Sequence, residues 1–268
     1  MEMRKRLATA TVLLAVLIAV IQFSPAWVLF LFLQLLVLGC LFEFYALASR
    51  KKLVPRRGLG AAMALLLGLS FYWPGLGFLP ALMACLLIAA FYFVLRFNTI
   101  ERMMNFPQSA AVTLFGPLYL AATLNHFLFL RRDFGFLAIY FLFVAVFLGD
   151  TGAYMIGTLL GRHKMLPVAS PRKTWEGAVG GLVVAGLAGV PAQMYFLPGL
   201  PLVTAVVASV LISAVSQVSD PFESLFKRAV GVKDSGTIFP GHGGFLDRVD
   251  SLILAGPFFY YFLKLVLK

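Results

Sequence analysis

Apolar runs recur along the whole chain and are separated by short polar segments. A helix that crosses a bilayer needs about 20 mostly apolar residues. Nine runs approach this length, at 7–23, 26–48, 59–73, 77–97, 109–130, 134–158, 177–197, 199–218 and 249–267. The third run is short and ends at Trp73-Pro74-Gly75, so eight spans are the alternative. The pattern predicts an all-α integral membrane protein, a polytopic bundle of about nine transmembrane helices.

The composition agrees with this pattern. Of the 268 residues, 61% are hydrophobic and only 12% are charged, whereas about 25% of a soluble domain is charged. The basic start and the first apolar run resemble a signal peptide, but the next run follows at once, so we expect a retained span. Cys40 and Cys85 lie inside apolar runs, which favours small buried side chains over a disulfide or a metal site.

The net charge is +11, and the basic residues are expected to lie mostly on one side of the membrane. With nine spans and a cytoplasmic N-terminus, 18 of the 22 lysines and arginines fall on the cytoplasmic side, as the positive-inside rule requires. We therefore expect a multi-pass protein of the cell inner (plasma) membrane with a cytoplasmic active site. The charge favours contact with membrane lipids or anionic substrates. Nucleic acid is not expected, because the chain has no soluble basic domain.

Carboxylates concentrate in the second half of the chain. Seven of the eleven are Asp150, Glu176, Asp220, Glu223, Asp234, Asp247 and Asp250. Mg²⁺ is typically held by one or two carboxylates together with substrate phosphates, and lysine or arginine binds the remaining phosphate oxygens. We expect residues 1–130 to form about five N-terminal spans, and residues 131–268 to form the catalytic helices around a cytoplasm-facing polar cavity.

The stretch around Asp220 permits two interpretations. Ser209, Ser213 and Ser216 lead to Asp220 as a polar stripe on one helix face, which Glu223 shares. The sequence Asp-Pro-Phe-Glu also fits a helix start, in which Asp220 and Glu223 only cap the helix.

Residues 239–250 read FPGHGGFLDRVD, a glycine-rich turn before the last apolar run. Glycines allow a backbone to approach a ligand closely, as phosphate loops require. Asp247 and Asp250 are three residues apart and share a helix face, either as a site or as an ion-pair cluster at a helix start. His242 is a candidate acid–base group or a loop hydrogen-bonding residue.

Two further segments have polar residues at a membrane boundary. Asp150 lies within an apolar run and needs a partner or a water-lined cavity. In the segment 170–177, Arg172 and Lys173 could hold phosphates, or the segment is a positive-inside loop anchored by Trp175. In the run at 177–197, the small residues Gly177, Gly181, Ala185 and Gly189 are spaced by four and predict a packing face.

These motifs resemble the phosphatidate cytidylyltransferase family, also called CDP-diacylglycerol synthases. The family signature, S-x-apolar-K-R, four residues, K-D, then P-G-H-G-G-apolar-x-D-R-apolar-D, begins here at Ser224 and ends at Asp250 with its spacing intact. The segments Asp150-Thr-Gly-Ala-Tyr and 170–177 also resemble family motifs. One departure is Ser219-Asp220-Pro221, because the family usually has Gly-Asp at this point.

The resemblance implies that CTP and phosphatidate are converted to CDP-diacylglycerol and pyrophosphate, and it suggests a homodimer. It implies Mg²⁺, with a second cation, held by Asp220 and Asp247. Its other catalytic residues would be Asp250, Lys227 and His242. Its substrate-binding residues would be Asp150, Ser170, Arg172, Lys173, Thr174, Ser224, Arg228, Lys233, Asp234 and Arg248.

Two other function classes stay open on the residues alone. Buried acids and glycine-rich turns also occur in secondary transporters. However, the halves show no inverted repeat, and the polar segments cluster at one face. Another membrane enzyme acting on lipid phosphates, such as a polyprenol kinase, would share the acids and bases but should lack the full signature.

Overall fold

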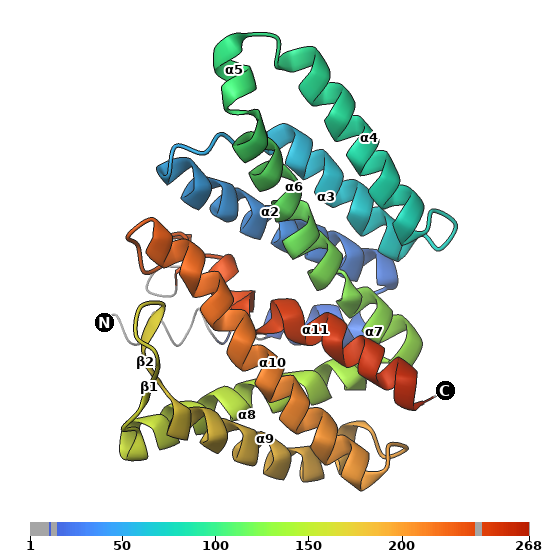
Figure 1. Ribbon diagram of the computed structural model, residues 1–268. Helices are drawn as coiled ribbons and strands as arrows, with labels where there is room; N and C mark the ends of the chain where they lie inside the picture. The colour runs from blue at the N-terminus through green and yellow to red at the C-terminus, as the bar shows by residue number, and fades with distance from the viewer. Residues whose placement is uncertain (1–10, 12–14, 239–242, 268) are drawn as a thin grey trace. The chain divides into compact units, whose positions relative to one another are not determined.

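The computed structural model describes residue 11 and residues 15–238 and 243–267. Its helices are α2 (Ala26–Arg50), α3 (Arg57–Tyr72), α4 (Phe78–Arg96), α5 (Ile100–Met104), α6 (Phe106–Leu124), α7 (His126–Phe134), α8 (Phe136–Leu160), α9 (Trp175–Phe196), α10 (Leu202–Ala229) and α11 (Leu246–Val266). Residues 15–23 are also helical. Two short strands, β1 (Lys164–Leu166) and β2 (Ser170–Thr174), lie between α8 and α9 (Figure 1).

Within the described residues, seven helices are long and apolar enough to cross a membrane. The helix α3 is apolar but has only 16 residues, or about 24 Å at 1.5 Å per residue, which is less than the hydrocarbon thickness. The predicted run at 7–23 lies partly outside the described residues. The prediction of an all-α polytopic membrane protein is confirmed, and the chain is a multi-pass membrane protein.

The chain folds as two compact units. The first unit consists of residues 1–128 and 234–248, and the second of residues 129–233 and 249–268. In the first unit, α2, α3 and α6 pack on one another and α4 packs on α3. Tyr45 of α2 is fully buried and donates a hydrogen bond to the carbonyl of Thr113 in α6, at 2.7 Å. Gly116 permits this contact, because a Cβ there would lie 2.9 Å from the Tyr45 ring.

The second unit is built on α8 and α9, which lie side by side, and α10 packs against both (Figure 1). A Cβ on Gly181 would lie 2.8 Å from the Gly149 carbonyl of α8, and one on Gly189 would lie 2.5 Å from Ser209 of α10. Ala185, between them, is fully buried. The predicted small-residue packing face is therefore confirmed, and its partners are helices of the same chain.

The loop expected at 161–176 is a hairpin. β1 and β2 pair antiparallel, with Lys164 opposite Thr174 and Leu166 opposite Ser170. Thr174 ends the hairpin and caps α9, because its hydroxyl accepts a hydrogen bond from the Gly177 amide at 3.2 Å. The hairpin lies at the end that α8 and α9 share (Figure 1). It gives the basic residues of this segment a defined backbone.

Candidate active site

Three carboxylates of the second unit are close enough to interact electrostatically: Asp150 of α8, Asp220 of α10 and Asp250 of α11. Asp150 accepts hydrogen bonds from Ser216 at 3.3 Å and from Ser251 at 3.1 Å. The partner that an aspartate within an apolar run requires is thus supplied by two hydroxyl groups, from α10 and α11. Three helices converge on one group of acids.

The hairpin contributes a cation to this group. The Lys173 Nζ atom lies 2.9 Å from Asp220 Oδ2, and the two side chains are 26% and 32% exposed. Lys173 also interacts with the charge of Asp150. Asp220 accepts a weaker hydrogen bond from Ser224, at 3.4 Å. From the sequence alone, Lys173 could bind a phosphate or could simply belong to a basic loop on the cytoplasmic side. The structure places it beside two of the predicted site acids.

The helix-start interpretation of Asp220 and Pro221 is wrong. α10 continues through Pro221 to Ala229. Membrane helices tolerate such prolines because neighbouring groups satisfy the freed backbone. Ser219, at the departure from the family pattern, is fully buried and donates a hydrogen bond to the main-chain carbonyl of Asp250. The Ser-for-Gly difference therefore adds a contact between α10 and α11 and leaves the backbone helical.

Glu223 and Lys227 form a second ion pair, one turn apart on α10. The Lys227 Nζ and Glu223 Oε2 atoms are 2.5 Å apart, and the side chains are 7% and 0% exposed, respectively. The positive charge of Lys227 also acts on Asp250. Sequence reasoning gave Lys227 a catalytic role but did not anticipate this buried partner, although the four-residue spacing was a visible signal.

Arg228 binds backbone. Its Nη1 donates to the Val232 carbonyl at 2.9 Å and its Nε to the Ala169 carbonyl at 3.3 Å. The arginine thereby connects the end of α10 to the hairpin within the second unit. Four other predicted substrate contacts, Arg172, Lys233, Asp234 and Arg248, are exposed, and Ser170 is half-buried. Thr174 is buried at the helix cap, so capping is the contact that the structure shows for its hydroxyl.

Asp247 belongs to the first unit. Its Oδ2 atom accepts hydrogen bonds from the Ser235 amide and hydroxyl, each at 2.8 Å, and from the Gly244 amide at 2.9 Å. Ser235 and Gly244, two described residues of the signature segment, therefore both bind this carboxylate. His242, the predicted acid–base residue, lies outside the described residues.

Sequence reasoning missed Glu43 of α2. Its side chain is 7% exposed, and its carboxylate accepts hydrogen bonds from the Phe245 and Leu246 amides, both at 2.9 Å, and from the Ser235 hydroxyl at 2.8 Å. A lone carboxylate inside a membrane span is by default a functional-site hypothesis. That signal was present in the run at 26–48, although most of the acids lie in the second half of the chain.

Among the described residues, no three His, Cys, Asp or Glu side chains form a group that could hold a metal ion. Mg²⁺ commonly takes only one or two protein carboxylates, with phosphates and water completing its shell. Asp220 suits such a role because its carboxylate is part-exposed and lies in a group where acids outnumber lysines. The predicted ligand pair, Asp220 and Asp247, remains a prediction from the sequence.

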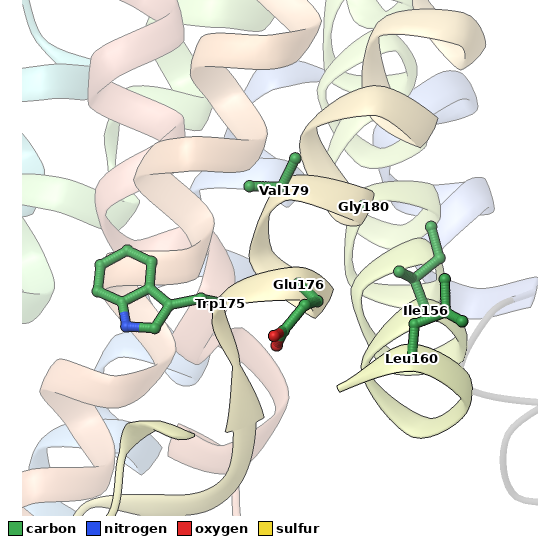
Figure 2. A pocket seen from close by; sticks show the side chains of 6 residues that line it. All are labelled: Ile156, Leu160, Trp175, Glu176, Val179 and Gly180. Carbon is green, nitrogen blue, oxygen red and sulfur yellow. The ribbon is translucent and has the colours of Figure 1, made fainter. Parts of the chain in front are cut away.

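An open groove of about 480 Å³ lies beside the shared end of α8 and α9. Its lining residues are Ile156, Leu160, Trp175, Glu176, Val179 and Gly180 (Figure 2). None of them is a predicted site residue. Glu176 accepts hydrogen bonds from the amides of Arg162 and His163, at 3.1 and 3.2 Å. It therefore holds the base of the hairpin, and the groove is separate from the acidic group.

Comparisons with known proteins match nearly the whole chain. A model of the cytidylyltransferase family covers residues 4–266. A phosphatidate cytidylyltransferase of Staphylococcus haemolyticus is 35% identical over 257 residues, which cover 95% of this chain and 96% of that protein. One from Bacillus subtilis is 36% identical over 187 residues, 69% and 67% of the two chains. One from Brucella suis is 46% identical over 139 residues, 50% of each chain.

Proposed function

Because the chain belongs to the cytidylyltransferase family and is therefore a nucleotidyltransferase, we propose that it converts CTP and phosphatidate to CDP-diacylglycerol and pyrophosphate. The observation that carries the proposal is a relative named phosphatidate cytidylyltransferase that aligns over 95% of this chain. Family membership favours an enzyme over the transporter alternative. The charge arrangement in the second unit supports the same conclusion.

In the proposed reaction, an oxygen of the phosphatidate phosphate attacks the α-phosphorus of CTP. A new P–O bond forms, the bond from the α-phosphorus to the bridging oxygen breaks, and pyrophosphate leaves with that electron pair. The nucleophile is already anionic, so the reaction needs no strong base. Catalysis then depends on positioning and on neutralising the phosphate charge.

Lys173 supplies positive charge next to Asp220 and Asp150, and it would bind phosphate oxygens of a substrate. Arg172 lies beside it on the hairpin and Lys233 follows α10, and both are exposed. Exposed cations at the end of a membrane helix suit the triphosphate of a soluble nucleotide. Lys227 would contribute through its charge on Asp250.

Asp220 would supply a carboxylate ligand for Mg²⁺. When bound, the ion would neutralise phosphate charge in this group. The interaction of Asp220 with Asp150 and Asp250 supports this role, because the three acids create a negative potential that Lys173 only partly offsets. A second cation and a homodimer remain predictions. The small-residue face of α9 does not bear on the dimer, since it packs on α8 and α10 of the same chain.

The basic segments 161–176 and 219–248 would face the cytoplasm, where CTP is found, with the N-terminus on the same side. Asp150 would lie toward the membrane end of the site, near the lipid headgroup.

The test is an assay of purified protein in detergent micelles with CTP, phosphatidate and Mg²⁺, measuring pyrophosphate release and CDP-diacylglycerol formation together. We expect equal amounts of both products. Product formation only with ATP or with a polyprenol acceptor would instead identify another membrane enzyme of lipid phosphates.

A further inference from the structure

Glu43 is the only acidic residue of α2 and lies about two turns before its end. Burying a carboxylate in a membrane helix is costly unless it is paired or accepts hydrogen bonds. A glutamate at this position therefore requires partners, and the three that the structure shows are Ser235, Phe245 and Leu246 of the signature segment.

Two of these partners are backbone amides at the start of α11. The Phe245 amide donates to Glu43 Oε1 and the Leu246 amide to Glu43 Oε2, both at 2.9 Å. The first amides of a helix have no partner within the helix, and the helix dipole favours negative charge at this end. Glu43 thus satisfies from outside two amides that α11 cannot satisfy itself.

The third partner couples Glu43 to Asp247. The Ser235 Oγ atom lies 2.8 Å from Glu43 Oε2 and 2.8 Å from Asp247 Oδ2. Its single proton can be donated to only one of the two carboxylates at a time. The Ser235 and Gly244 amides also donate to Asp247. The same short segment therefore binds both carboxylates.

The backbone is shaped to bring this segment onto α2. A Cβ at Gly244 would lie 2.3 Å from both carboxylate oxygens of Glu43. Gly39, one turn before Glu43 on the same face, receives the Phe245 ring, and a Cβ there would lie 2.7 Å from it. Side chains at these two positions would push the segment away from Glu43.

We infer that Glu43 is a positioning residue of the active site: it holds Ser235 and residues 244–246 so that the Asp247 carboxylate keeps one orientation. The inference rests on the proposed function, because the metal-ligand role of Asp247 is the one that the resemblance to the phosphatidate cytidylyltransferase family implies. Glu43 itself contacts the signature segment and is not assigned to the reacting groups.

The test compares Glu43→Gln with wild type. Glutamine keeps the shape but has one acceptor oxygen, and its NH₂ group would face an amide donor, so at least one backbone hydrogen bond is lost. We expect kcat to fall about 10- to 100-fold, the range typical for residues that orient a site, and the half-saturating Mg²⁺ concentration to rise. We also expect hydrogen–deuterium exchange to accelerate in residues 243–248.

Glu101→Gln is the matched control, because Glu101 is an exposed glutamate of the same unit. It should change neither kcat nor exchange in residues 243–248. Ser235→Ala is the milder variant, should Glu43→Gln not fold: it removes the bridging hydroxyl and keeps the Ser235 amide. For Ser235→Ala we expect a smaller fall in kcat, a smaller rise in the half-saturating Mg²⁺ concentration and a smaller acceleration of exchange.

The outcomes separate this inference from the proposed function. If the wild type forms no CDP-diacylglycerol, the proposed function fails and the catalytic role of Glu43 fails with it, whatever the exchange shows. If the wild type is active but neither variant changes kcat or the Mg²⁺ dependence, only the inference is overturned. Accelerated exchange with unchanged kcat also overturns the inference, since the contact would then be structural alone.

Discussion

Lys173 of β2 and Asp220 of α10 form an ion pair with 2.9 Å between Nζ and Oδ2. The pair connects a surface hairpin to a carboxylate that faces two further acids, Asp150 and Asp250. In the proposed function, Lys173 would bind a phosphate of the entering nucleotide and Asp220 would bind the metal ion, so both would give up this contact. The pair is therefore the first place to test the proposed chemistry.

Lys173→Ala should raise the KM for CTP or phosphatidate. A hydrogen bond to a charged group contributes about 1.5–3 kcal/mol, which corresponds to about 10- to 150-fold in kcat/KM. Steady-state kinetics with each substrate varied in turn checks this. Lys164→Ala, on the exposed face of β1, is the matched control and should behave as wild type. Unchanged kcat and KM values in Lys173→Ala would mean that Lys173 does not bind substrate and that the basic hairpin only sets the orientation of the chain in the membrane.

Asp220→Asn should lower turnover by at least about 100-fold, as expected when a group that stabilises transferred charge is lost. Asparagine keeps one of the two acceptor oxygens, so it retains the contact with Ser224 or with Lys173 but not both. Because Asp220 and Lys173 are part-exposed, water can replace the lost contact and the protein should remain folded. Turnover and size-exclusion elution are measured together. Asp133→Asn is the control, because Asp133 has a similar exposure of 30% and pairs with Arg132, away from the predicted site residues. Wild-type turnover in Asp220→Asn would contradict its role as a ligand.

Lys227→Met should destabilise the protein, because it removes the partner of the buried Glu223 carboxylate. Breaking one side of a buried pair costs about 3–5 kcal/mol, whereas replacing both sides by apolar residues is often neutral. The double variant Lys227→Met with Glu223→Leu should recover most of the unfolding free energy, measured by denaturation in detergent. If Lys227 also binds phosphate, the double variant will be stable but inactive. Full activity in it would assign Lys227 a structural role alone.

Gly181→Ala should lower the apparent melting temperature. The added Cβ would meet the Gly149 carbonyl at 2.8 Å and the Ala153 Cβ at 2.9 Å, and such overpacking costs about 1–3 kcal/mol. Gly199→Ala is the control, because nothing lies within 4 Å of a Cβ there. Thermal unfolding in detergent, followed by circular dichroism, checks both. Equal melting temperatures for the two variants would mean that α8 and α9 can separate slightly without loss.

The apolar runs predicted the helices of the membrane region well, because a span of about 20 apolar residues permits little else. The run at 134–158 became α8 (Phe136–Leu160), and the run at 177–197 became α9 (Trp175–Phe196). The run at 199–218 ended too early, since α10 continues to Ala229. The polar end of α10 is stabilised by the Ser219 hydrogen bond and the Glu223–Lys227 ion pair. A hydropathy pattern does not detect such contacts.

The site could be predicted in part. The sequence named Asp150, Asp220 and Asp250 among the candidate site residues, and the structure brings these three together. The pairing of Lys173 with Asp220 agrees with the predicted mixture of acids and bases. The hairpin was not predicted, because strands of three and five residues leave little pattern. Glu43 could not be connected to the signature segment from sequence, since its partners lie about 200 residues away and only tertiary packing brings them together.

One face of α9 packs against α8 and α10, so its opposite face is left exposed. The exposed side chains of α9 include Val179, Val183, Leu187 and Met194, which are 55–69% exposed. They are bulky, whereas the residues of the packing face are small. In a bilayer, lipid acyl chains should therefore contact the large apolar side chains on this face of α9. A substitution on this surface is expected to change the contact of α9 with lipid and to leave the acidic group intact.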